Sequence, residues 1–180
     1  MYSSVDFKSL SKAGFSKTYS CIEDAMRYYD SDPGTCCKNF RMALESAIYD
    51  IYEILGKDSA DANLKSNIDR LSSIIPSGFQ KDELIFEMNN VRLIGNDYAH
   101  FSVDEKDPFK DRLTCYCAMK KIADWMIMFS TEYPKYLKRK EEKRKIRKEK
   151  SKKAFKIIGT IAAGTITVLS AILGIKHSRR

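Results

Sequence analysis

The chain has 180 residues, of which 43% are hydrophobic, and it carries a formal net charge of +8. This length and composition exclude an intrinsically disordered protein and fit one domain with a core of ordinary size. The five cysteines form no C-x-x-C pair, so the sequence lacks a common zinc spacing. It predicts free, mostly packed thiols in a reducing cytosol, with no metal and no cofactor. The cysteines are Cys21, Cys36, Cys37, Cys115 and Cys117.

The net charge is distributed unevenly along the chain. Residues 135–156 contain thirteen Lys or Arg and three Glu, a local charge of +10, and residues 176–180 add +3. Residues 1–134 therefore carry −5. An acidic head precedes a basic tail, so we expect a polyanionic partner to meet the tail rather than the head.

The first half of the head predicts two helices after a loose or partly helical start over residues 1–17. The stretch YSCIEDAMRYYDSDP predicts a short helix that ends before Pro33, which then stands near the first position of the next helix. That next helix has the clearest helical period in the chain, with Gly56 as its C-terminal cap. Arg41 and Glu45, four residues apart beside its buried face, predict an ion pair within the helix. The predicted buried residues are Phe40, Ala43, Leu44, Ala47, Ile48, Ile51, Tyr52 and Leu55.

The second half of the head predicts three more helices. The stretch DANLKSNIDRLSSIIP predicts one that Pro76 breaks, and two others are expected over residues 81–101 and 108–130. No segment shows the alternation of a strand, so residues 1–133 predict an all-α bundle. The predicted inward residues are Leu64, Ile68, Leu71, Ile75, Leu84, Ile85, Met88, Val91, Tyr98, Phe109, Leu113, Tyr116, Ile122, Trp125 or Met126, and Phe129.

Residues 134–156 have almost no apolar face. They predict a basic helix or linker that needs water or anions around it. Anionic lipid is the expected partner because an apolar stretch follows, and nucleic acid is the alternative. The candidate binding residues are Lys138, Arg139, Lys140, Lys143, Arg144, Lys145, Arg147 and Lys148.

Residues 157–175 contain no charged side chain. As a helix they would be roughly 28 Å long, close to the roughly 30 Å hydrocarbon core of a bilayer. One alternative is a buried helix of the head, but the basic segment separates these residues from the head. The other is a helix that lies flat on a membrane, but these residues lack the polar face that such a helix needs. The sequence therefore predicts a single transmembrane helix. The larger positive charge on its N-terminal side predicts a tail-anchored protein of the cell membrane, with a cytoplasmic head and residues 176–180 as a short basic tail.

Small residues fall on one stripe of this predicted transmembrane helix. Such a stripe lets two helices approach closely, which favours self-association, although small residues are also common in such helices for other reasons. The stripe contains Gly159, Ala163, Thr167, Ser170 and Gly174.

The stretch VRLIGNDYAHF places Arg92, Asn96 and His100 at four-residue steps, roughly on one side of a helix. One interpretation is a site that cuts RNA without a metal, in which His100 transfers a proton and Arg92 holds the phosphate. The other is packing: Arg92 pairs with an acid, Gly95 and Asn96 allow close helix contact, and His100 caps the helix. The spacing alone favours packing.

The same stretch, together with DPGTCCKNFRMALESAIYDIY, resembles the HEPN superfamily of helical domains. The resemblance covers residues 19–130 and is closest to a branch with the signature R-x-x-G-N-x-x-x-H, which is also found fused to type I restriction motor subunits and other bacterial defence proteins. Many HEPN proteins are metal-independent ribonucleases with the site R-N-x-x-x-H at a dimer interface. By position, Asn96 and His100 match this form.

The match to the ribonuclease form is incomplete at the arginine. Gly95 takes its place, and Arg92 lies one turn earlier. Arg92 and His100 are therefore separated by about 12 Å along the helix, against about 7.5 Å in the common form. One phosphate could hardly reach both side chains within one subunit, whereas a second copy could complete the site.

These patterns together favour a tail-anchored membrane protein whose HEPN-like head is a non-catalytic assembly or sensing module. The head is expected to form a homodimer or a higher oligomer, and the resemblance places it in bacterial or phage conflict. Two alternatives stay open: a membrane-tethered endoribonuclease that binds RNA, and an effector whose C-terminal helix disrupts membranes.

Overall fold

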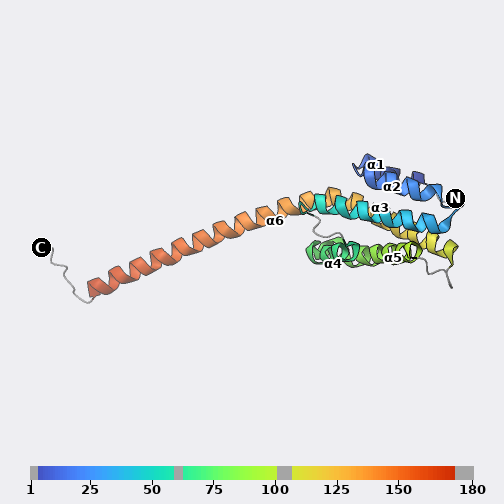
Figure 1. Cartoon of the computed structure of the whole chain (residues 1–180). Coiled ribbons are helices and arrows are strands. Elements are labelled where there is room, and N and C mark those ends of the chain that lie inside the picture. Colours follow the sequence, from blue (N-terminus) through green and yellow to red (C-terminus); the bar gives the residue numbers. More distant parts are fainter. Residues whose placement is uncertain (1–3, 59–62, 101–106, 173–180) are drawn as a thin grey trace. The chain divides into compact units, whose positions relative to one another are not determined.

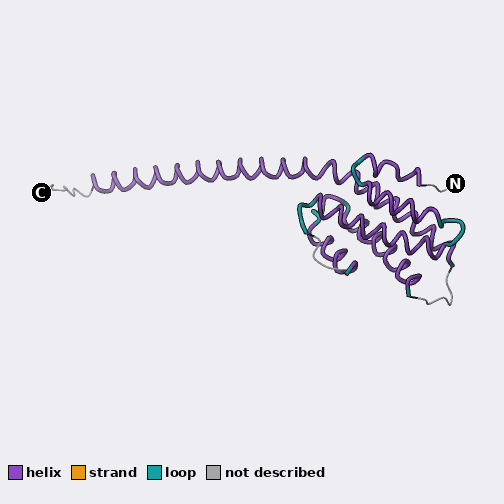
Figure 2. Tube along the Cα trace, turned by 45° about the horizontal axis from the view of Figure 1, so that its top comes forward, coloured by secondary structure: helices purple, strands orange, loops and turns teal. Residues whose placement is uncertain are grey.

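The computed structural model describes residues 4–58, 63–100 and 107–172. In these ranges every regular element is a helix and none is a strand, as the tube in Figure 2 shows. The prediction of an all-helical fold is confirmed. The chain divides into two compact units, Met1–Tyr133 and Pro134–Arg180.

The first unit begins with a short 3-10 helix, η1 (Ser4–Phe7), followed by α1 (Lys8–Lys12), α2 (Ser16–Arg27) and α3 (Pro33–Ile54) (Figure 1). The start of the chain is therefore partly helical, as expected, and the short helix begins earlier than its sequence pattern indicates. α2 packs along α3, the longest helix that lies wholly within this unit.

Both ends of α3 are capped as the sequence predicts. Asp32 Oδ1 accepts a hydrogen bond from Thr35 N at 3.0 Å, and a proline occupies the first turn. At the other end Gly56 has a φ of +62°, which a residue with a side chain rarely adopts. Lys57 N donates to Tyr52 O at 3.0 Å, which closes a Schellman motif around this glycine.

The chain then forms α4 (Leu64–Ile74), a second 3-10 helix η2 (Ser77–Phe79) and α5 (Lys81–Ala99). Both α3 and α4 pack against α5, so α5 is held on two sides by helices that precede it. α5 ends two residues before its predicted limit. Residues 101–106, between α5 and the next helix, lie outside the described residues.

The last helix, α6, runs continuously over Pro108–Ile172. The prediction that it ends at Ser130 is wrong, because the helix continues through Pro134. A proline inside a helix removes one backbone donor, here the one that would reach the carbonyl of Ser130. The Lys-, Arg- and Glu-rich sequence that follows has a high helix propensity, which accounts for the continuation.

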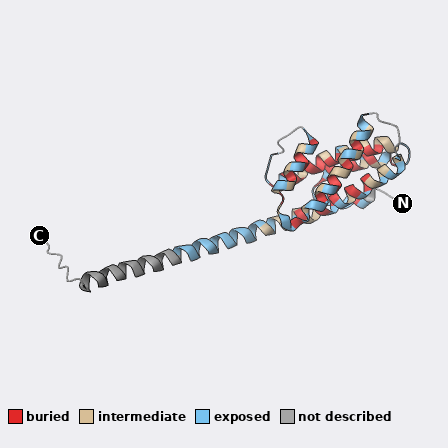
Figure 3. Ribbon diagram, turned by 90° about the horizontal axis from the view of Figure 1, so that it is seen from below, coloured by how far each residue is buried: buried red, intermediate tan, exposed pale blue. Residues whose placement is uncertain are grey.

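The buried residues of the first unit lie where its helices face one another (Figure 3). All the residues predicted to be buried on α3 and α4 are buried. On α6 the prediction is wrong for Phe109 and Leu113, which are exposed, and right for the residues from Tyr116 onward. The ring of Phe109 instead lies beneath the guanidinium of Arg112, 4.9 Å away. On α5, Ile85 and Tyr98 are only half-buried.

An aromatic cluster joins η2 to α6. Trp125 Nε1 donates to the carbonyl oxygen of Phe79 at 2.6 Å. The Trp125 ring stacks on Phe129 with centroids 4.4 Å apart, and Phe129 meets the Phe79 ring edge-on at 4.9 Å. This cluster buries large aromatic area and satisfies the indole N–H, so it fixes η2 against the helix.

In the second unit the described side chains, residues 134–152, are exposed apart from the half-buried Tyr136 (Figure 3). Within the portion of the chain that the structure describes, no helix has the length and apolarity needed to span a bilayer. The backbone is helical as far as residue 172. The side chains of residues 153–172, and residues 173–180 entirely, lie outside the description, so the predicted transmembrane helix over residues 157–175 and the tail after it fall there.

Candidate functional site

The polar stretch on α5 is built around a close contact between α5 and α3. Gly95 is buried, and a Cβ atom at this position would lie 2.5 Å from the Cβ of Arg41 and 3.1 Å from the carbonyl oxygen of Cys37. Only a residue without a side chain allows this approach. Packing therefore accounts for the glycine at position 95.

Asn96 forms a hydrogen bond with an arginine of the neighbouring helix α3. Arg41 Nε on α3 donates to Asn96 Oδ1 at 2.6 Å. The Nη1 atom of the same guanidinium lies 3.0 Å from Glu45 Oε1, so the predicted ion pair within α3 is confirmed. The Arg41 side chain is only 29% exposed. Its guanidinium is therefore held in place from both sides.

Arg92 lies in the adjacent turn of α5. Its Nε donates to Asn89 Oδ1 at 3.1 Å, and Asn89 Nδ2 in turn donates to the carbonyl oxygen of Ile85 at 3.0 Å. In the part of the chain that is described, this partner is a neutral amide rather than the acid that the packing interpretation expects. The contact uses one N–H group of the Arg92 guanidinium and orients its other N–H groups.

His100 is separated from this group. It is the C-cap residue that directly follows α5, and its backbone N–H donates to the carbonyl oxygen of Asn96 at 3.1 Å. Its side chain is exposed. The position of His100 at the helix end fits the packing interpretation. Asn96, Arg41 and Arg92 line a common cavity, and His100 does not line it.

That cavity has a volume of about 380 Å³ and lies where α3, α4 and α5 meet. Three of its lining side chains are cationic, two are amides and one is apolar. None of these described side chains is acidic, which makes the cavity a candidate site for an anion. The lining residues are Arg41, Asn63, Leu64, Lys65, Arg92 and Asn96.

Sequence reasoning missed Lys65 and Asn63 as members of this group. Neither stands near Arg92 or Asn96 in the sequence, and only the packing of α4 on α5 brings them together. The sequence does contain an indication of the helix contact beside this cavity. Gly95 falls on the buried stripe of α5, and a glycine on such a stripe indicates a close helix contact.

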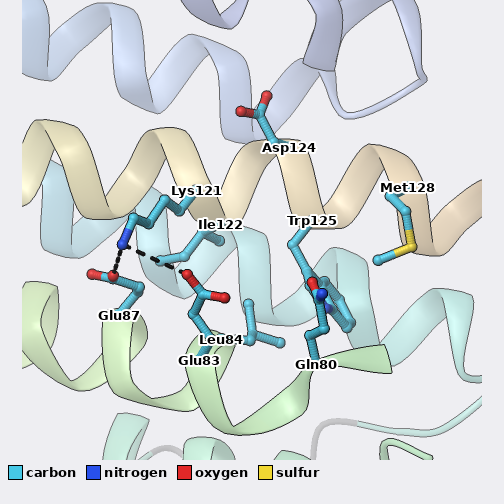
Figure 4. Close-up of a pocket in the computed structure, with 9 residues that line it drawn as sticks. All are labelled: Gln80, Glu83, Leu84, Glu87, Lys121, Ile122, Asp124, Trp125 and Met128. Atoms are coloured by element: carbon cyan, nitrogen blue, oxygen red, sulfur yellow. Dashed lines mark hydrogen bonds and ion pairs between the residues drawn. The ribbon is translucent and has the colours of Figure 1, made fainter. Parts of the chain in front are cut away.

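A second cavity of about 290 Å³ lies between α5 and the first part of α6 (Figure 4). Lys121 on α6 points toward α5, where its Nζ lies 2.5 Å from Glu87 Oε1 and 3.7 Å from Glu83 Oε1. The Glu87 side chain is only 8% exposed, so Lys121 compensates a nearly buried carboxylate. The same contact raises the pKa of Lys121. This arrangement is an ion pair that joins two helices, and Trp125 closes one side of the cavity.

Three of the five cysteines are packed in the interior, whereas Cys21 is half-buried and Cys117 is exposed. No disulfide joins them, and Cys36, Cys37 and Cys115 are buried between α3 and α6. Burial raises the pKa of Cys36 to about 12, and a hydrogen bond with Cys37 together with burial raises the pKa of Cys115 further. Such thiols stay protonated at neutral pH and are poor nucleophiles. Among the described residues no cluster of His, Cys, Asp or Glu could hold a metal ion.

The eight candidate binding residues of the basic segment, from Lys138 to Lys148, are all exposed. Lys145 and Lys140 make local contacts: Lys145 Nζ lies 3.2 Å from Glu141 Oε1, and the ammonium of Lys140 lies 5.8 Å from the centroid of the Tyr136 ring. Both contacts are local to the helix surface. The segment therefore presents positive charge on all sides, as its composition predicts.

Comparisons with known proteins found no family model, no curated protein and no solved structure that matches this chain. The resemblance to HEPN domains stays a prediction that depends on the motif residues named above. Any functional conclusion has to come from the geometry of the head and from the charge pattern of the tail.

Proposed function

We propose that the chain is a tail-anchored membrane protein whose HEPN-like head acts as an assembly and sensing module. The observation that carries this proposal is an apolar stripe on the outward face of α5. A HEPN-like head would place the protein in bacterial or phage conflict, where its anchor would localise the assembly at the membrane.

The stripe consists of two large apolar side chains in water. Phe86 is 63% exposed and Leu93 is 51% exposed. They stand seven residues apart, so they lie on one face of α5, opposite the buried Met88 and Val91. An exposed apolar face on an otherwise amphipathic helix loses contact with water when a second helix covers it.

A second copy of the chain is the partner that fits this stripe. Two copies of α5 packed antiparallel about a two-fold axis near Asn89 and Asn90 would place Phe86 of each copy against Leu93 of the other. A two-fold interface is self-complementary in this way, and homodimers of this symmetry are the commonest soluble assemblies. The polar asparagines at the centre would hydrogen-bond across the axis.

The support for the proposed membrane anchor comes from the sequence. Residues 157–175 are uncharged and long enough to span a bilayer, and the basic segment precedes them. The basic side chains among residues 138–148 are exposed and would lie on an anionic leaflet, each contributing about 1 kcal/mol. Fractionation of the full-length protein and of a version that ends at Ser151 tests this part: the shorter version should leave the membrane fraction.

The assembly is tested by the oligomeric state of full-length protein in mild detergent, measured by light scattering. The double substitution Phe86→Ser and Leu93→Ser should convert a dimer or higher oligomer to the monomer. Phe109→Ser is the matched control, because Phe109 is also 63% exposed but lies on α6. A monomeric wild type, or equal disruption by the control, would show that the stripe is not an assembly surface.

One observation favours the ribonuclease alternative: Arg92 and Asn96 line a cationic cavity with Arg41. His100, the only proposed proton-transfer group, does not line it. If the alternative holds, expression should degrade cellular RNA and His100→Ala should abolish this effect while the protein stays folded. Intact RNA in cells that express the wild type would sink it.

A further inference from the structure

The cationic cavity between α3, α4 and α5 has a charge that suits a doubly charged anion. Arg41, Lys65 and Arg92 contribute three positive charges to its lining. Glu45, which lines a smaller adjoining hollow, pairs with Arg41 and offsets one of them. The remaining charge of about +2 matches a phosphate monoester, which carries roughly −1.5 to −2 at neutral pH.

The two arginines are pre-organised for such a ligand. Arg41 is fixed by Asn96 and Glu45, and Arg92 is fixed by Asn89. Each of these contacts uses one N–H group of a guanidinium that has five. A side chain that is already ordered loses less conformational entropy when it binds, and a guanidinium can hold two phosphate oxygens at once.

The beginning of α4 adds to the positive potential of the cavity. Asn63 caps this helix by accepting a hydrogen bond from Lys65 N at 2.9 Å, and Asn63, Leu64 and Lys65 all line the cavity. The first turn of a helix carries a partial positive charge from its unpaired N–H groups. This field acts in the same direction as the three cationic side chains.

The lining also restricts what the phosphate can be attached to. Among the described residues, the lining contains no aromatic side chain on which a nucleobase could stack, and Leu64 is the only apolar one. Residues 1–134 carry a net charge of −5, which opposes the approach of a long polyanion such as RNA. A compact and hydrophilic ligand fits both facts.

We propose that this cavity binds a small hydrophilic phosphate monoester of the sugar-phosphate class. The inference rests on the sensing part of the proposed function, for which it names the class of ligand, and it does not depend on assembly through α5. Phosphate oxygens would bind Arg41 and Arg92, Lys65 would supply a third charge, and the amides of Asn63 and Asn96 would meet the hydroxyl groups.

Calorimetric titration of the full-length protein with inorganic phosphate, glucose 6-phosphate, adenosine monophosphate and a short single-stranded RNA tests the proposal. Glucose 6-phosphate should bind, and more tightly than glucose, which lacks the phosphate. Arg92→Gln and Lys65→Gln should each weaken this binding by about tenfold or more, since each removes a charge-assisted contact. Lys12→Gln, at an exposed lysine on α1 outside the cavity, should leave the affinity unchanged.

Several results would overturn the proposal. Absence of glucose 6-phosphate binding, or equal loss with the Lys12 control, would show that the cavity is not a phosphate site. Tighter Arg92-dependent binding of the RNA or of adenosine monophosphate would replace the ligand class. Repeating the titration with the Phe86→Ser and Leu93→Ser variant separates the two proposals, because a monomer that still binds the sugar phosphate supports the site independently of assembly.

Discussion

Arg41 on α3 donates a hydrogen bond through Nε to Asn96 Oδ1 on α5, with 2.6 Å between the two atoms. The contact joins the two sequence stretches DPGTCCKNFRMALESAIYDIY and VRLIGNDYAHF, since Arg41 lies in the first and Asn96 in the second. Because Gly95 brings the helices together at this point, the arginine that serves Asn96 comes from another helix rather than from its own. Asn96 is thereby committed to a contact within the head.

This contact should contribute measurably to stability. In a double-mutant cycle of Arg41→Ala and Asn96→Ala, we expect a coupling free energy of about 1–2 kcal/mol, because the donor is charged and partly buried. Urea unfolding of the four proteins measures it. The matched comparison is Arg92 with Asn89, a part-buried pair within one helix, whose coupling should be only about 0.2–0.5 kcal/mol. Equal coupling in the two cycles would argue against a special role for the contact between helices.

Gly95→Ala should destabilise the head, although alanine is the better helix former. The added methyl group would lie 2.5 Å from Arg41 Cβ, and that atom cannot move without its helix. Overpacking of this kind costs about 1–3 kcal/mol, which exceeds the gain of about 1 kcal/mol in helix propensity. Thermal unfolding followed by circular dichroism measures the difference.

The control for this prediction is Gly78→Ala, because a Cβ at Gly78 meets no atom within 4 Å. It should change the free energy of unfolding by less than about 0.5 kcal/mol. A Gly95→Ala protein as stable as the wild type would show that α3 and α5 can separate at little cost.

The fold follows from the sequence wherever a long amphipathic pattern meets a strong cap. α3 is such a case, since its apolar period runs from Phe40 to Leu55 and is bounded by Asp32 and Gly56. The patterns fail twice along α6. Phe109 continues the apolar period but is exposed, and Pro134 does not end the helix. Periodicity reports which residues could share a face, whereas burial depends on what packs against that face.

The candidate site is less predictable than the fold. The stretch containing Arg92 and Asn96 is visible in the sequence as a polar face, and Arg41 as a member of an ion pair. Their meeting with Lys65 depends on how α4 packs on α5, which no local pattern encodes. His100 shows the converse, because regular spacing along a helix did not bring it into the cavity.

Phe129 and Phe109 provide a direct test of which aromatic residues of α6 are part of the core. Phe129→Ala should cost about 3–5 kcal/mol, because its buried ring packs on Trp125 and Phe79. Phe109→Ala should cost less than about 1 kcal/mol, which is the value of its contact with the Arg112 guanidinium. Urea unfolding of both variants decides the point, and similar losses would mean that Phe109 is covered in solution.

The cap of α3 should make stability depend on pH in the acid range. Hydrogen bonds from the Thr35 hydroxyl and backbone N–H to the carboxylate lower the pKa of Asp32. A carboxyl group whose pKa is lower in the folded state stabilises the fold at pH values above its unfolded pKa. This contribution is lost as the pH falls through the lower, folded pKa, below about pH 4.

Two substitutions distinguish what the capping hydrogen bond of Asp32 contributes to stability from what its negative charge contributes. Asp32→Ala removes both and should cost about 1 kcal/mol at pH 7, whereas Asp32→Asn keeps an oxygen that accepts from Thr35 N and should cost only about half as much. The free energy of unfolding, measured by urea titration between about pH 3 and pH 7, should show the wild type and Asp32→Asn converging at the acid end. A difference that stays constant over this range would show that the Asp32 charge contributes nothing to the helix start.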